Sequence, residues 1–65
     1  MWKVLYVSSN KDAVSKLTTL LNDGGIMNRT RRISAEAPDD AYLEILVPGS
    51  EIVSAQNILF EAEID

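Results

Sequence analysis

Hydrophobic residues follow a strand-like pattern in three segments of the chain. Residues 2–7 are aromatic and β-branched with a single charge, which predicts a first strand. Residues 42–47 predict another strand because apolar side chains alternate along it. Residues 26–34 are less hydrophobic and carry several charges, which is typical of a strand at a sheet edge. In 42–47 the core face would hold Leu43, Ile45 and Val47, and the opposite face Tyr42, Glu44 and Leu46.

Between the strand segments 2–7 and 26–34, apolar residues recur at helical spacing. Ser9 and Asp12 have the spacing of a capping box, so we expect a helix to begin here. Gly24 and Gly25 end it, because glycine accepts the left-handed backbone that closes a helix. The apolar stripe of this helix consists of Val14, Leu17, Leu20 and Leu21.

A second helix is predicted after the last strand segment. Pro48 and Gly49 interrupt the strand, and Ser50 is a suitable N-cap residue. Glu51 would favour the positive end of the helix dipole. The apolar stripe of this helix consists of Ile52, Ala55, Leu59 and Ala62.

The predicted order β-α-β-β-α favours an α+β, ferredoxin-like fold in one domain spanning residues 1–65. In that arrangement the third strand lies in the middle of the sheet, antiparallel to the first and the second. Both helices cover one face. The first strand is then an edge strand, although its sequence is unusually apolar for an edge.

The composition removes several classes of function. The chain has six Lys and Arg against ten Asp and Glu, a formal net charge of -4, so it repels nucleic acid and anionic membranes as a whole. It has no cysteine and no histidine, which excludes Cys/His and Ser/His dyads and imidazole-ligated metals. No export signal precedes the first strand, so we expect a cytoplasmic location.

The strand face that points away from the helices is predicted to be apolar and to form an interface. An exposed patch of large side chains usually marks a binding surface, and a bare strand edge is a template for pairing. We therefore expect a homodimer formed through the open sheet face or the first-strand edge. This assignment of faces takes Leu5 and Val7 as core residues, and a phase error of one residue would instead place Val4 and Tyr6 in the core. The expected interface residues are Trp2, Val4, Tyr6, Tyr42 and Leu46.

A basic cluster in the second strand is a candidate anion site. Arg29, Arg31 and Arg32 are three of the six basic residues. Alternation places Arg29 and Arg31 on one side, where two guanidinium groups would hold a phosphate or carboxylate. The alternative is a soluble edge strand that is neutralised by Glu44 or Glu51.

No catalytic or metal-binding constellation is predicted. Asp39 and Asp40 are adjacent in a proline-containing loop and lack the spacing of a calcium loop. We expect no cofactor either. A glutamate decarboxylase activity in particular is doubtful at this chain length, because it needs pyridoxal phosphate on a Schiff-base lysine in a large cleft. The three lysines, Lys3, Lys11 and Lys16, fall on a strand and on an exposed helix face.

The chain resembles a family of small bacterial signal-transducing proteins of unknown biochemical function. Val-Leu-Tyr-Val in the first strand, Asp23-Gly24-Gly25-Ile26 after the helix, and Leu43-Glu44-Ile45-Leu46-Val47-Pro48 before Ser50-Glu51 carry this resemblance. It implies a ferredoxin-like βαββα fold and no established catalytic residues. We therefore expect a non-enzymatic regulatory or binding module for a protein or a small anionic ligand. The alternative is an accessory subunit of a larger enzyme assembly.

Overall fold

The computed structural model describes residues 1–33 and 42–64. It contains three strands and two α-helices in the predicted β-α-β-β-α order, so the α+β, ferredoxin-like fold is confirmed. A short 3₁₀ turn, η2, precedes the second helix. The elements are β1 (Trp2–Ser8), α1 (Lys11–Asp23), β2 (Arg29–Arg32), β3 (Leu43–Pro48), η2 (Gly49–Glu51) and α2 (Ile52–Glu61).

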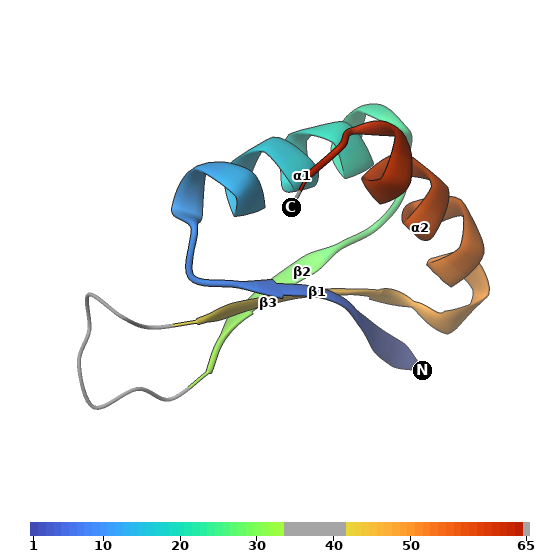
Figure 1. The fold of residues 1–65 in the computed structure, drawn as a ribbon. Helices are drawn as coiled ribbons and strands as arrows, with labels where there is room; N and C mark the ends of the chain where they lie inside the picture. The colour runs from blue at the N-terminus through green and yellow to red at the C-terminus, as the bar shows by residue number, and fades with distance from the viewer. Residues whose placement is uncertain (34–41, 65) are drawn as a thin grey trace.

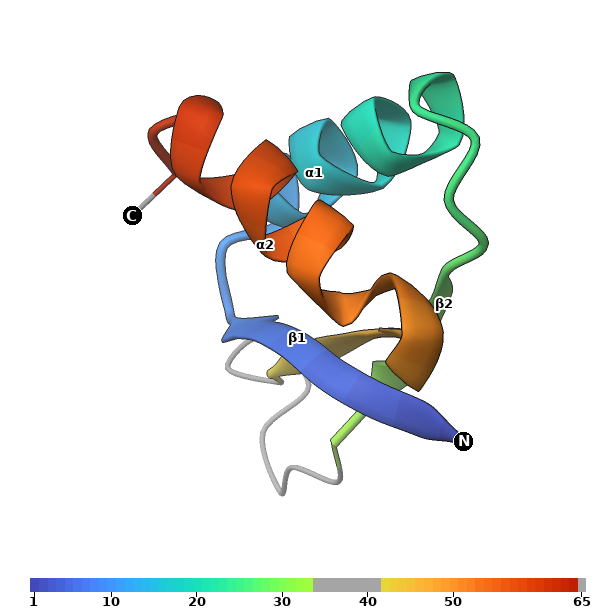
Figure 2. The ribbon, with the colours of Figure 1, turned by 90° about the vertical axis from the view of Figure 1, so that its right-hand side faces the viewer.

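The strands form one sheet in the order β1-β3-β2. β3 pairs antiparallel with both neighbours, so β1 and β2 are parallel to each other and both are edges. α1 and α2 lie on the same side of the sheet, and the other side is left without a helix (Figures 1 and 2). This uncovered side positions the candidate site.

The core lies between the helices and the sheet and is entirely apolar. α1 contributes Val14, Leu17 and Leu21, all from its predicted stripe. β3 contributes Ile45 and Val47, which confirms the predicted core face of that strand. Ile26 and Ala55 complete the buried cluster, and Leu5, Tyr6, Leu43, Ile52, Ile58, Leu59 and Ile64 pack against it.

The N-terminus of α1 is capped by Asn10 and not by the predicted capping box. The Asn10 Oδ1 accepts hydrogen bonds from the backbone N–H groups of Asp12, at 3.0 Å, and Ala13, at 3.1 Å. Ser8 supports this turn because its Oγ accepts the Asn10 backbone N–H at 2.9 Å. The helix therefore begins one residue later than a Ser9 cap requires.

Gly25 ends α1 in the left-handed conformation that the sequence predicted, with φ of 75°. The Ile26 N–H donates to the Leu21 carbonyl at 2.9 Å, and the Gly25 N–H donates to the Asn22 carbonyl at 3.0 Å. This bond pair is the Schellman motif, in which an apolar contact accompanies the backbone bonds. Ile26 and Leu21 both belong to the buried core and supply that contact.

A β-bulge in β1 corrects the predicted faces of this strand. Val4 pairs with Leu46, but the register then shifts and Tyr6 pairs with Ile45, so Leu5 is the extra residue. Tyr6 is thereby directed to the core side, where it packs with Leu5. Strict alternation had placed Tyr6 on the open face, and this prediction is wrong.

The same bulge directs Val7 away from the core, to the side of the sheet that the helices do not cover. Val7 pairs with Glu44 and is 45% exposed, although it was expected in the core with Leu5. Neither the predicted assignment of β1 side chains to the two sheet faces nor the inverse assignment describes the whole strand. Val4 lies on the open face, as one phase requires, whereas Tyr6 lies on the core face, as the other requires.

The second strand is shorter than the predicted 26–34. Ile26 lies in the turn that closes α1 and is buried, while the Asn28 side chain turns back to donate to the Asn22 Oδ1 at 2.7 Å. Only Arg29–Arg32 form the strand. The predicted end of this strand at Ser34 and the proline-containing loop with Asp39 and Asp40 lie outside the described residues.

The second helix begins without the predicted Ser50 cap. Ser50 lies inside η2, and no side chain caps the first turn of α2. Of the predicted stripe, Ala55 is buried and Ile52 and Leu59 pack against the core, whereas Ala62 lies beyond the end of α2 and is absent from the core cluster. Ile58 is an additional core contact that the predicted stripe did not include.

Candidate functional site

The candidate site is the sheet face that neither helix covers, which we call the open face. The register places Val4 opposite Leu46, and Arg29 opposite the same Leu46 from the other edge. The backbone bond from the Ile33 N–H to the Tyr42 carbonyl, at 2.9 Å, continues this pairing beyond β2. By alternation the open face consists of Trp2, Val4, Val7, Arg29, Arg31, Ile33, Tyr42, Glu44, Leu46 and Pro48.

Several apolar side chains of the open face are accessible to solvent. Val4 and Val7 are each 45% exposed, and Tyr42 is 52% exposed. Ile33 is exposed as well. Leu46 differs because it is buried, although it is absent from the core cluster on the helix side. Something on the open face must therefore cover it.

We infer that Trp2 and Arg29 provide the cover over Leu46. These residues belong to the two edge strands, which the middle strand separates by roughly 10 Å. The Arg29 guanidinium nevertheless lies 4.3 Å from the centre of the Trp2 ring. Both side chains must lean across β3 to reach this cation–π distance, and Leu46 lies in the middle strand beneath them.

A second pair on the open face joins Arg31 to Glu44 across β2 and β3. The Arg31 Nε donates to the Glu44 Oε1 at 2.8 Å, and its Nη2 lies 2.7 Å from the same oxygen. The Arg31 side chain is 61% exposed, so the bond is a surface salt bridge of modest energy. Glu44 thus occupies the place that an external anion would take beside Arg31, as the alternative in the sequence analysis proposed.

The three arginines of the basic cluster do not converge on one point. Arg29 and Arg31 share the open face, as predicted, but Arg31 is already paired with Glu44. Arg32 pairs with Leu43, which places it on the opposite side of the strand. Among the described residues, Arg29 is in no salt bridge, and its positive charge is therefore the one that the open face presents to a partner.

Alternation alone missed three members of the open face and included Tyr6 wrongly. Val7 was assigned to the core, Pro48 was expected to interrupt the strand, and Ile33 was not assigned to a face. A bulge leaves no clear signal in a short apolar strand, so the exchange of Tyr6 for Val7 was not predictable from the pattern. Ile33 was accessible to sequence reasoning, since it continues the alternation of Arg29 and Arg31.

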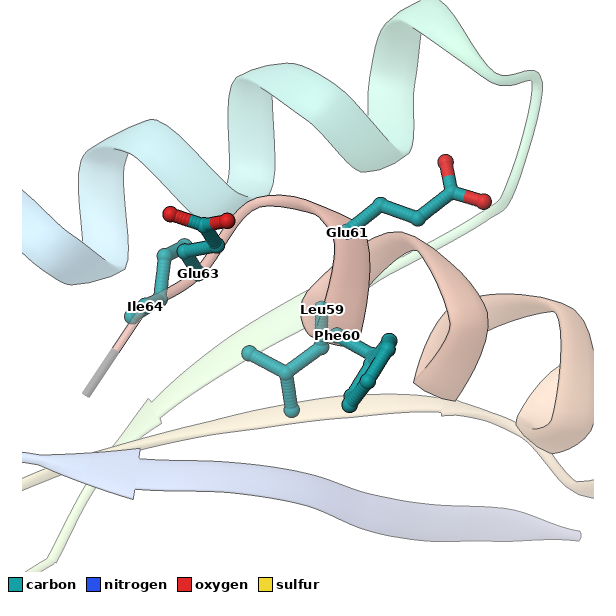
Figure 3. Close-up of a pocket in the computed structure, with 5 residues that line it drawn as sticks. All are labelled: Leu59, Phe60, Glu61, Glu63 and Ile64. Carbon is teal, nitrogen blue, oxygen red and sulfur yellow. The ribbon is translucent and has the colours of Figure 1, made fainter.

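A separate exposed apolar surface lies on α2. Phe60 is 84% exposed, and Val53 is exposed on the same helix. Phe60, Leu59, Glu61, Glu63 and Ile64 line one hollow at the end of α2, where Leu59 and Phe60 project toward the sheet side and the two carboxylates point away from them (Figure 3). The one sign of this surface in the sequence is that Phe60 falls outside the apolar stripe predicted for its helix.

The described residues hold no group of three potential metal ligands among His, Cys, Asp and Glu. Asp39 and Asp40 lie outside the described part of the chain. No helix in the described ranges has the length and apolar character needed to cross a membrane. Comparison with protein-family models, curated proteins and solved structures finds no significant match to this chain.

Proposed function

We propose that this chain is a non-enzymatic binding module that acts through protein–protein contacts made by its open face. The observation that carries the proposal is the exposure of Val4, Val7 and Tyr42 on a sheet face that no helix covers. Removing apolar area of this kind from water stabilises association. The resemblance to small bacterial signal-transducing proteins supports a regulatory role for such contacts.

The partner that the chain itself supplies is a second copy, so we propose self-association in the cytoplasm. Of the two routes considered from the sequence, the structure favours the open face over the first-strand edge. The bulge at Leu5 interrupts the regular edge of β1, and Lys3 places a charge on it. Bulges and lysines are devices that discourage edge pairing.

The small-anion alternative is the weaker proposal. Because the Glu44 carboxylate already neutralises Arg31, a phosphate ion would have to displace it or bind Arg29 alone. A single exposed arginine binds phosphate weakly. Inorganic phosphate is therefore expected to leave the melting temperature of the wild-type chain unchanged.

Sedimentation velocity of the full chain, from about 10 µM to about 1 mM, tests the proposal. We expect the weight-average mass to rise with concentration. Val7→Lys, which places a charge among the exposed apolar side chains of the open face, should keep the chain monomeric. Thr19→Lys adds the same charge to an exposed position of α1 and should leave association unchanged. A wild-type chain that stays monomeric throughout, or a Val7→Lys chain that associates normally, would overturn the proposal.

A further inference from the structure

α2 carries the most exposed aromatic side chain of the described residues. Val53 and Phe60 are seven residues apart, so they lie on one side of the helix, separated by about 10 Å along its axis. Phe60 is 84% exposed. A large aromatic group in contact with water is typical of an interface, where such residues are enriched.

Two carboxylates lie near Phe60 at the C-terminal end of α2. Glu61 and Glu63 line the same hollow, and the C-terminal end of a helix adds the negative end of its dipole. No basic residue occurs in the last turn of α2. Lys16 donates from its Nζ to the Ala62 carbonyl at 3.4 Å, but neither carboxylate is in a salt bridge within the described ranges.

The open face has the opposite character. It combines Val4, Val7 and Tyr42 with two arginines and one glutamate, and the charge on Arg29 is not neutralised by a described carboxylate. Packing two open faces against each other would bring together two surfaces of net positive charge, which opposes that arrangement. The acidic, aromatic end of α2 complements the open face in both charge and apolar character.

We propose that a second copy of this chain docks the end of its α2 on the open face. Phe60 of one copy then packs against the exposed apolar side chains of the open face, and Glu61 or Glu63 meets Arg29. The helix of the second copy supplies the layer that the sheet lacks on this side. The inference rests on the proposed function and specifies the two surfaces that meet, which differ from each other.

Two consequences follow from this geometry. A contact between two different surfaces leaves one of each kind free in a dimer, so further copies add head to tail as the concentration rises. Three strands about 13 to 23 Å long at about 4.8 Å spacing present a planar area of roughly 270 Å². This area is below that of a standard interface, so we expect association only at high micromolar concentration.

Complementation between two variants of the full chain tests the proposal. Arg29→Glu disables the open face and retains the α2 end, while Phe60→Ser does the reverse. Each variant alone should remain monomeric in sedimentation velocity at about 1 mM, and an equimolar mixture should form a dimer that does not grow further. Lys11→Glu and Met27→Ser make matched changes at exposed positions elsewhere and should associate like the wild type.

The outcomes separate this inference from the proposed function. If Phe60→Ser associates normally while Val7→Lys does not, the open face still binds but the α2 end is not its partner, and the inference fails. If Arg29→Glu and Phe60→Ser are each monomeric and their equimolar mixture is also monomeric, the two-surface contact is overturned. If the wild type itself never associates, the proposed self-association fails as well. Circular dichroism of every variant verifies that each chain is folded.

Discussion

The Arg29 guanidinium lies 4.3 Å from the centre of the Trp2 ring, although the two residues belong to opposite edges of the sheet. This pair spans the middle strand and covers Leu46, the one buried side chain of the open face among the described residues. Arg29 therefore has two roles: its contact with Trp2 stabilises the open face, and its charge is the one that the described part of this face presents to a partner.

Replacing Arg29 by alanine should lower stability and expose the tryptophan. A cation–π contact at a surface contributes about 0.5–1 kcal/mol, and loss of the cover over Leu46 adds to this. We expect a lower urea midpoint and a shift of Trp2 fluorescence to longer wavelength, since the chain has a single tryptophan. Lys11→Ala, on the exposed start of α1, is the control. An unchanged emission spectrum would show that the pair is not formed in solution.

The β1 bulge predicts opposite sensitivities for two adjacent residues. Tyr6→Ala should destabilise the chain by about 2 kcal/mol or more, because Tyr6 packs against the core. Val7→Thr should change the free energy of unfolding by only about 0.5 kcal/mol, because Val7 is half exposed. Chemical denaturation measures both values. The reverse order would mean that β1 follows the regular alternation and has no bulge.

Asn10 and Ser9 provide a similar comparison at the start of α1. Asn10→Ala removes the acceptor of two backbone N–H groups and should cost about 1 kcal/mol. Ser9→Ala should be close to neutral, since Ser9 does not cap the helix. Equal losses in thermal or urea unfolding would favour the capping box that the sequence indicated.

Gly25 is the position where a side chain is most costly for backbone reasons. Its φ of 75° disfavours any residue with a Cβ, while nothing lies within 4 Å of the position that a Cβ would occupy. Gly25→Ala should therefore cost about 1 kcal/mol through backbone conformation alone. Gly25→Asn should cost less, because asparagine tolerates the left-handed region. A loss as large for asparagine as for alanine, in urea unfolding, would contradict this explanation.

Sequence reasoning predicted the topology because the apolar periods of α1, β3 and α2 are regular and their ends carry turn residues. It predicted the uncovered sheet face for the same reason. It failed at Tyr6 and Val7, where one inserted residue reverses the direction of each following side chain. The contact between Trp2 and Arg29 was also out of reach, since it depends on two side chains from non-adjacent strands leaning across a third.

The pairing of Arg31 with Glu44 illustrates a different limit. Both residues were candidates from the sequence, and Glu44 was named as a neutralising partner, but spacing alone did not decide between Glu44 and Glu51. The antiparallel register decided it by placing Arg31 directly opposite Glu44. Once β3 is the middle strand, such cross-strand pairs follow from the register.

Nuclear magnetic resonance of the ¹⁵N-labelled chain during dilution tests the central claim most directly, because it reports which residues change environment as copies separate. Between about 1 mM and about 20 µM, we expect amide shifts to move at Val4, Val7 and Tyr42 on the open face and at Phe60 and Glu61 on α2. Amides at the start of α1 should stay constant. Shifts that are independent of concentration everywhere, or that move only along the outer edges of β1 and β2, would contradict an open face that binds a second copy.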